Sequence, residues 1–105
     1  MARAAWMRVA VEGDSMAPTL LPGDRLLAQR AAGLEVDDLV VVMDPRQQDR
    51  LLVKRVASIN RAGVEVLGDN PGSSTDSRIF GIVPRELVIA VAKYRYAPAQ
   101  RAGKL

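Results

Sequence analysis

Cysteine and histidine are both absent from this chain of 105 residues. No disulfide can form, so cysteine usage gives no indication of the redox compartment. A Cys nucleophile, a Ser-His-Asp triad and the usual zinc ligand sets are excluded together. Covalent catalysis would therefore need a hydroxyl nucleophile, with a lysine, a carboxylate or a terminal amine as its base. The lysines are Lys54, Lys93 and Lys104. No metal or other cofactor is expected.

Aromatic residues and long apolar runs are also scarce. Apolar residues make up 49% of the chain, but only four are aromatic, so the core must consist of Val, Leu, Ile and Ala. The longest apolar run, Leu87 to Ala92, has six residues, whereas a membrane span needs roughly 18. No apolar stretch follows Arg3 or Arg8, so we expect no signal peptide. These features predict a soluble, cytoplasmic chain; the alternative is membrane association at the extracytoplasmic face.

The charge is basic but dispersed. The net charge is +3, with twelve Arg and three Lys. The basic residues stand singly among acidic ones, and no run of three or aromatic stacking platform accompanies them. This pattern is typical of a solvated surface of mixed charge, and no nucleic-acid partner is expected.

Short strand-like runs alternate with turn residues along most of the chain. Their spacing, without convincing helical periods, predicts a mainly β fold, either a compact folded antiparallel sheet or a partly open barrel. The predicted strand segments are 7–12, 25–29, 38–43, 50–58, 63–67 and 86–96. We expect one domain over residues 1–96. Residues 97–105 contain Pro98 and Gly103 and are predicted to form a flexible tail.

Ser15 follows the first predicted strand and precedes a proline-restricted turn, in the segment Gly13 to Leu20. A serine that the backbone holds at a strand end projects from the sheet edge, with its geometry fixed before a substrate arrives. This placement suits a nucleophile. Serine is also an ordinary turn residue, so the segment alone leaves a structural role open.

Lys54 lies within a strand-like segment between aliphatic residues. Alternate residues of a strand share a face, which groups Lys54 with Leu52 and Val56 and turns Arg55 away. An ordinary lysine has a pKa of about 10.4 and is protonated at pH 7. Burial can lower the pKa to about 7–8, where the free amine can accept a serine proton. A lysine that snorkels at a sheet edge is the alternative.

Residues 68–78 are rich in Gly, Asn, Asp and Ser, a composition that by itself fits a long polar turn. Asp76 and Arg78 stand two residues apart beside several hydroxyl groups. This pattern suits a loop that an ion pair holds together while a Ser or Thr oxygen faces a neighbouring amine.

Together these segments resemble the sequence boxes of the type I signal peptidase family, in the family's order. Ser15 to Leu20 matches the nucleophile box, and Leu52 to Val56 matches the general-base box. The third box is matched by Gly68 to Asn70, Ser74 to Arg78 and Gly81 to Pro84. The resemblance implies a compact sheet like that of signal peptidases and of the related LexA-like proteins.

Carried over by position, the resemblance implies that Ser15 attacks the scissile carbonyl group and that Lys54 takes its proton. The backbone N–H of Ser15 would bind the oxyanion, where preorganised donors contribute several kcal/mol. The residues that would support this pair are Ser74, Asp76, Arg78 and Asp69.

Each supporting residue has an implied task. Ser74 would hydrogen-bond the amine of Lys54 and orient it. Asp76 and Arg78 would form an ion pair that braces the site, and Asp69 would belong to the same supporting shell.

The chain departs from many family members in three places. Gly13 stands where some carry a serine that donates to the oxyanion. Lys54 and Gly68 are only 14 positions apart, so a large insertion is missing, and only 14 residues precede Ser15, so we expect no membrane anchor. LexA-like self-cleaving repressors need a cleavable segment well upstream of the serine, which we do not expect in this chain. The compact form most resembles nickel-type superoxide dismutase maturation proteases, which remove a propeptide from a soluble precursor.

The sequence therefore predicts a serine endopeptidase that removes an N-terminal propeptide or signal peptide from a precursor polypeptide, with nickel superoxide dismutase as a candidate substrate. One alternative is secretory signal peptide cleavage at the membrane surface, with peripheral membrane contact. The other is a non-catalytic peptide-binding module. Because Ser15, Lys54 and Ser74 are all present, the sequence favours the enzyme.

Overall fold

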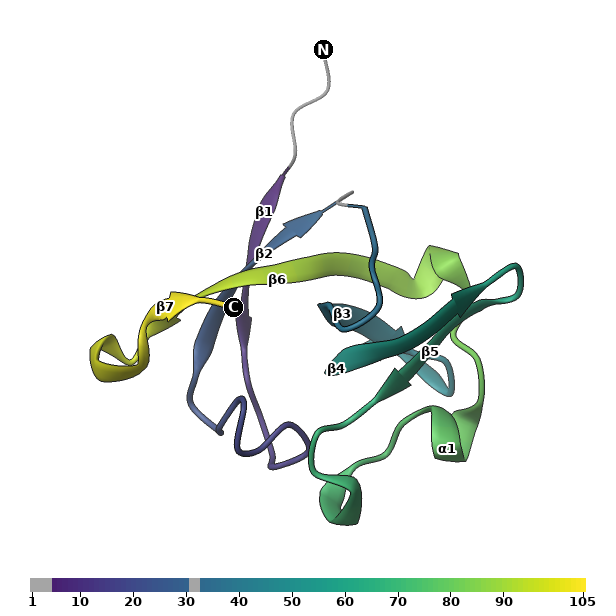
Figure 1. Ribbon diagram of the computed structural model, residues 1–105, viewed down its shortest axis with the longest axis horizontal. Helices are drawn as coiled ribbons and strands as arrows, with labels where there is room; N and C mark the ends of the chain where they lie inside the picture. The colour runs from purple at the N-terminus through teal and green to yellow at the C-terminus, as the bar shows by residue number, and fades with distance from the viewer. Residues whose placement is uncertain (1–4, 31–32) are drawn as a thin grey trace.

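The computed structural model describes residues 5–30 and 33–105, and its strands form one antiparallel sheet (Figure 1). The strand order is β1-β2-β6-β3-β4-β5, and β7 pairs with β6 outside this path. The strands are β1 (Trp6–Ala10), β2 (Arg25–Arg30), β3 (Leu39–Asp44), β4 (Gln47–Asn60), β5 (Gly63–Leu67), β6 (Val88–Ala97) and β7 (Gly103–Lys104). The predicted mainly β fold is confirmed, as an open folded sheet with β1 and β5 at the ends of its strand order.

In residues 5–30 and 33–105, helical structure is limited to single turns. These are the 3₁₀ helices η1 (Pro71–Ser73), η2 (Arg85–Leu87) and η3 (Ala99–Arg101), and the α-helix α1 (Ser77–Phe80). Each predicted strand segment overlaps one of the strands β1 to β6, whereas β7 and the helical turns are absent from the prediction. In the described part of the chain, no helix has the length and apolar character needed to cross a membrane.

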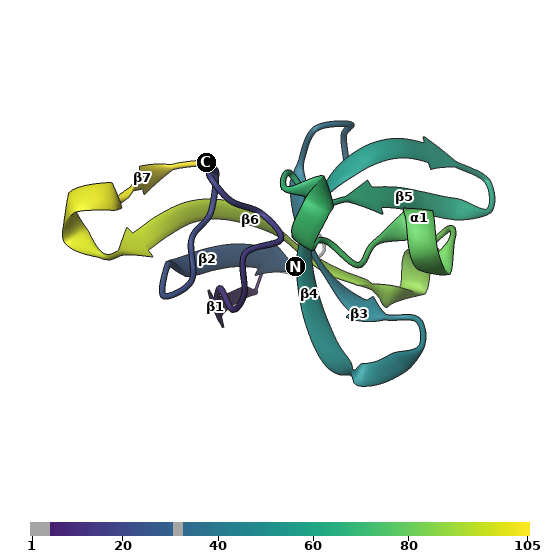
Figure 2. The same ribbon diagram turned by 90° about the horizontal axis from the view of Figure 1, so that it is seen from below.

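The long strand β6 joins two halves of the sheet. Figure 2 shows β1, β2 and β7 around one end of β6, and β3, β4, β5 and α1 around the other. Each half has its own apolar core, and β3 contributes to both because successive strand residues point to opposite faces. Val41 packs into the first core, and Val40 and Val42 pack into the second. This double burial explains why β3 is apolar without interruption from Leu39 to Met43.

The C-terminal residues 97–105 differ from the predicted flexible tail. After Ala97 the chain turns through η3 and returns as β7, which pairs with β6. The backbone N–H of Leu105 donates to the Lys93 carbonyl at 2.9 Å. Arg101 pairs with the buried carboxylate of Asp24. The structure therefore places these residues against the sheet, because they hold a charged partner that lies far away in the sequence.

The backbone at Gly63 leaves no space for a side chain, so a substitution there should lower the stability of the fold. It begins β5 with φ +143°, and a Cβ there would collide with the Val83 carbonyl group. That carbonyl cannot easily move, because Val64 and Val83 exchange two backbone hydrogen bonds of 2.8 Å. We predict that Gly63→Ala lowers the free energy of unfolding by roughly 1–3 kcal/mol, measured by urea denaturation.

Gly72→Ala is the matched control, because a Cβ at Gly72 meets no atom within 4 Å. This substitution should change the free energy of unfolding by no more than about 0.5 kcal/mol. Equal stabilities for the two variants would contradict the described approach of Gly63 to Val83.

Candidate active site

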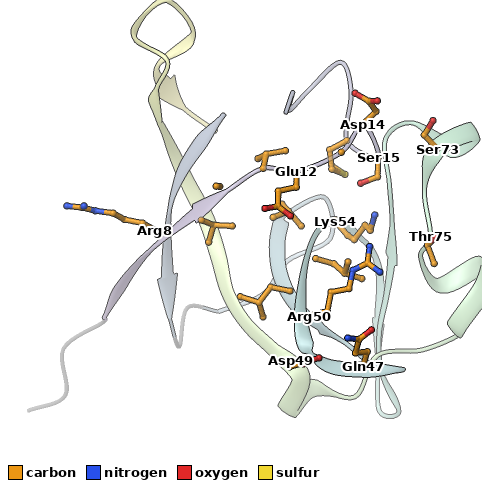
Figure 3. Close-up of a pocket in the computed structure, with 18 residues that line it drawn as sticks. Arg8, Glu12, Asp14, Ser15, Gln47, Asp49, Arg50, Lys54, Ser73 and Thr75 are labelled. Carbon is orange, nitrogen blue, oxygen red and sulfur yellow. The ribbon is translucent and has the colours of Figure 1, made fainter. Parts of the chain in front are cut away.

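A groove of about 630 Å³ separates residues 8–16 from the first half of β4 (Figure 3). Ser15 lines one wall, and Lys54 lines the other. Ser73 and Thr75, from the loop that follows β5, complete the lining near them. The groove thus brings together all three segments that the sequence singles out.

The backbone and two buried side chains fix the loop that carries Ser15. Its base is closed by a hydrogen bond of 2.8 Å from the Val11 N–H to the Asp24 carbonyl. Met16 and Leu20 anchor the loop in the first core, with exposed fractions of 1% and 0%. Ser15 itself is half-buried at the groove. The apolar residues of the Ser-Met-x-Pro-Thr-Leu segment therefore hold the loop while its serine stays accessible.

The segment after β5 holds the same loop from the other side. The Asn70 N–H donates to the Ser15 carbonyl at 2.9 Å, and the Asn70 side-chain amide donates to the Asp14 carbonyl at 3.1 Å. Thr19 donates its hydroxyl proton to Asp69 at 2.6 Å. These contacts connect the first and third predicted segments directly.

Asp69 also binds Arg55 on β4. The guanidinium group donates to both carboxylate oxygens, at 2.9 and 2.8 Å. These hydrogen bonds, aided by the one from Thr19, hold the pKa of the Asp69 carboxyl below its usual value. The ionised carboxylate of Asp69 therefore links Arg55 on β4 to Thr19 in the loop of Ser15. These are the contacts through which Asp69 could support the site.

Lys54 is buried, with an exposed fraction of 3%. Its Nζ donates to Ser74 Oγ at 3.3 Å. Burial is the largest influence on its pKa and lowers it, because the ammonium form loses solvation. The negative charge of Asp76 opposes this shift, while the positive charges of Arg50 and Arg78 add to it, and the pKa of Lys54 stays below its ordinary value.

Asp76 ends the chain of contacts that begins at Lys54. Its carboxylate is fully buried and accepts hydrogen bonds from Ser74 Oγ at 2.6 Å and from the Gly68 N–H at 2.8 Å. Arg78 adds two guanidinium hydrogen bonds of 3.0 and 2.6 Å. Burial raises the pKa of the Asp76 carboxyl, but these hydrogen bonds, led by those from Arg78, outweigh it and hold the pKa far below its usual value.

The ionised state of Asp76 fixes the direction of the hydrogen bonds. A carboxylate only accepts, so the Ser74 proton points to Asp76. The Ser74 oxygen then accepts an N–H from Lys54. A neutral lysine amine held in this way keeps its lone pair free for another proton.

The six site residues predicted from the sequence fall into two connected groups. Lys54, Ser74, Asp76 and Arg78 form one hydrogen-bonded chain. Ser15 and Asp69 belong to the loop on the opposite wall and its support. Figure 3 shows the polar ends of Ser15 and Lys54 directed into the same part of the groove. A direct hydrogen bond between them stays a prediction.

Several residues of the site were not assigned a role by the sequence. They are Thr19, Arg55, Gly68 and Asn70. Gly68 and Asn70 lie inside the matched Gly-Asp-Asn segment, which was the available signal, but neither carries reactive chemistry. Their contacts are mainly through the backbone, and such contacts leave no characteristic side-chain pattern.

Comparison with known proteins identifies the family. The family described as "Signal peptidase, peptidase S26" matches residues 1–66 and 58–97. The mitochondrial ATP-independent inner membrane protease subunit 1a of Arabidopsis thaliana is 35% identical over 122 residues, which cover 90% of this chain and 73% of that protein. The probable signal peptidase I-1 of Synechocystis sp. is 25% identical over 143 residues, with the same two coverages of 90% and 73%. A signal peptidase I of Leptolyngbya laminosa is 48% identical over 40 residues, or 38% of this chain and 20% of that protein.

These matches show that the chain is a serine peptidase that acts on a precursor polypeptide. It belongs to the signal peptidase family S26. Within the described ranges, no group of three or more His, Cys, Asp or Glu side chains could hold a metal ion.

Gly68 lies so close to Ser74 and Ser15 that a side chain there should disturb the site. A Cβ at Gly68 would collide with the Ser74 side chain and approach the Ser15 carbonyl oxygen to 2.6 Å. We predict that Gly68→Ala lowers kcat for a precursor peptide by at least about tenfold, because it separates the two walls of the site. Gly72→Ala, in the same loop with open space around it, should keep kcat within about twofold. Equal kcat values would show that this close approach does not matter.

Proposed function

We propose that this peptidase cleaves one peptide bond near the N-terminus of a precursor, with Ser15 as nucleophile and Lys54 as general base. The observation that carries the proposal is the buried amine of Lys54, oriented by Ser74 in the groove that Ser15 lines. A lysine with a lowered pKa beside a hydroxyl in a groove is the combination that covalent catalysis without histidine requires.

The reaction follows from these roles. Ser15 Oγ attacks the scissile carbonyl carbon while its proton moves to the neutral Lys54 amine. The backbone N–H of Ser15 binds the oxyanion of the tetrahedral intermediate. When the intermediate collapses, the C–N bond breaks and Lys54 returns the proton to the leaving amine. Water then attacks the acyl-enzyme ester, with Lys54 again taking and returning one proton.

Two unpaired strand edges are placed to bind a substrate in an extended conformation. Among the described residues, β1 pairs only with β2, so its other edge has no strand partner there. On β4, Gln47 and residues 51–55 pair with β3, while the pairing of β4 with β5 begins at Arg55 and ends at Asn60. The unpaired edge of residues 47–53 and that of β1 therefore both border the groove. A polypeptide lying between them can form backbone hydrogen bonds with either edge, as in peptide recognition by strand addition.

The proposal also names the precursor that the peptidase cleaves. A short Asn60–Gly63 turn joins β4 to β5, and this compactness supports a peptidase that trims a soluble propeptide, with the nickel superoxide dismutase precursor as the specific candidate. The names of the relatives, an inner membrane protease and a signal peptidase, favour signal peptide cleavage at a membrane surface as the second candidate.

A paired assay separates the two candidates. The same purified chain is given a soluble nickel superoxide dismutase precursor without lipid, and a signal peptide precursor in liposomes. Cleavage of the first at its propeptide junction supports the soluble reaction. Turnover that appears only with liposomes would replace the soluble proposal with the membrane one.

The pH dependence of turnover tests Lys54. Only the neutral amine accepts a proton, so activity should rise with pH as Lys54 deprotonates. Burial lowers the Lys54 pKa, so the midpoint should lie below the ordinary lysine value of about 10.4. Lys54→Arg should abolish turnover, because the guanidinium group stays protonated. Lys93→Arg is the control and should leave the profile unchanged; measurable turnover by Lys54→Arg would remove Lys54 as the base.

Ser74 is tested by comparison with its neighbour Ser73. Ser74→Ala should lower kcat by about one to three orders of magnitude, because the base loses its orientation. KM should barely change, and stability should fall by no more than about 0.5–1.5 kcal/mol. Ser73→Ala removes an exposed hydroxyl that lines the same groove, but the Lys54 amine bonds Ser74, so kcat should fall far less in Ser73→Ala than in Ser74→Ala. A wild-type kcat for Ser74→Ala would exclude Ser74 from the mechanism, and binding without turnover in the wild type would favour a peptide-binding module.

A further inference from the structure

Asp24 forms a charged cluster at the base of the loop that carries Ser15. Its carboxylate is 2% exposed. One oxygen accepts from the Leu21 N–H at 2.9 Å, from Arg95 Nη1 at 2.9 Å and from Arg101 Nη2 at 3.0 Å. The other oxygen accepts from Arg101 Nε at 3.1 Å. The C-terminal segment therefore supplies a two-pronged guanidinium contact to the start of β2.

Arg95 extends the cluster into the loop itself. The same Nη1 that binds Asp24 also donates to the Thr19 carbonyl at 2.9 Å. Its Nε donates to the Arg101 carbonyl at 2.6 Å, which ties the end of η3 to β6. Thr19 in turn donates its hydroxyl proton to Asp69. One residue of the loop thus contacts both the C-terminal segment and the segment that follows β5.

The cluster keeps its charge under working conditions. Burial alone raises the pKa of Asp24, but hydrogen bonds from Arg101, the Leu21 N–H and Arg95 outweigh it and lower the pKa to about 2. Asp24 stays ionised at any pH at which Lys54 could act as a base. Loss of the Arg101 contact would leave a buried carboxylate with fewer donors, and the loop base would have to shift to hydrate it.

The loop is consequently held from two directions, with Ser15 between them. Asn70 and Asp69 hold it on the side of Lys54. Asp24 and its two arginines hold it on the side away from the groove-lining residues of β4. A displacement of about 1 Å in a reacting group can cost about a hundredfold in rate, so support at both sides has a catalytic consequence.

We propose that Asp24, Arg95 and Arg101 are positioning residues: the C-terminal segment braces the base of the nucleophile loop and keeps Ser15 aligned with Lys54. The inference rests on the proposed function. It gives residues 98–105 a task in catalysis, although none of them lines the groove.

The chain contains a matched control for this cluster. Asp44, at the end of β3, is 1% exposed and binds Arg46 through the same two-pronged contact, at 3.2 and 3.0 Å. This pair lies in the β3–β4 hairpin and makes no hydrogen bond to the Ser15 loop. Arg101→Ala and Arg46→Ala therefore each remove a two-pronged guanidinium contact from a buried aspartate, and only the first removes support from the loop; Arg46→Ala also removes the contact with the Phe80 ring.

The test measures kcat, KM, the pH midpoint and the melting temperature of both variants on one precursor peptide. Arg101→Ala should lose about tenfold to a hundredfold in kcat. Its KM and pH midpoint should stay unchanged, because Lys54 and Ser74 are untouched. Arg46→Ala should keep kcat within about twofold of the wild-type value, even if its melting temperature falls as much as that of Arg101→Ala. Equal kcat in the two variants, or losses that simply follow the melting temperature, would overturn the proposal.

Two further measurements keep the outcome clear. Arg101→Lys preserves the charge without the two-pronged geometry and should recover part of the lost kcat. If Arg101→Ala does not fold, a wild-type kcat for Arg101→Lys overturns the proposal.

Amide hydrogen exchange of residues 13–20 should be faster in Arg101→Ala than in Arg46→Ala, whichever residue is the nucleophile. Equal exchange rates in the two variants would contradict the proposed support of the loop by the C-terminal segment. Failure of the proposed function would instead appear as undiminished cleavage by Ser15→Ala.

Discussion

The desolvated amine of Lys54 is the constraint on which the site depends. A buried lysine beside a carboxylate would normally keep its proton, because the ion pair favours the charged form. Here Ser74 stands between the amine and Asp76, and Arg78 already neutralises that carboxylate. Asp76 therefore orients Ser74 through a hydrogen bond without contributing a full unpaired negative charge to Lys54. This arrangement explains how one small domain can combine a buried amine, a buried carboxylate and a lowered lysine pKa.

The Ser15 side of the groove is organised by the backbone more than by reactive side chains. Met16 and Leu20 are buried in the first core, and Asn70 binds the carbonyl group of Ser15. Gly68 permits the close approach of the Ser74 segment to this loop. Gly13, two residues before Ser15, has φ +71° and open space around it. A serine there would fit sterically but would strain the backbone, which is consistent with the proposal that main-chain N–H groups bind the oxyanion.

Much of the fold and of the lysine half of the site could be predicted from the sequence. Alternation locates the strands, and the same period predicts that Lys54 shares a face with buried aliphatic residues. The contacts of Lys54 with Ser74 and of Asp76 with Arg78 also follow from the predicted roles. The contacts of Asp24 with Arg101 could not be predicted, because 77 positions separate the two residues and neither lies in a recognisable pattern. A tail composition of Pro, Gly and Arg looks flexible when its charged partner is unknown, which is why residues 97–105 differ from expectation.

The most direct measurement of the central claim is the site and rate of acyl-enzyme formation. An activated ester of a short peptide acid, mixed with the chain and quenched rapidly, leaves its acyl group on the attacking hydroxyl, and mass spectrometry of the digest locates it. The proposed mechanism predicts acylation at Ser15, faster as Lys54 loses its proton and abolished in Lys54→Met. Acylation at another hydroxyl, or at Ser15 with an equal rate in Lys54→Met, would contradict the pairing of these two residues.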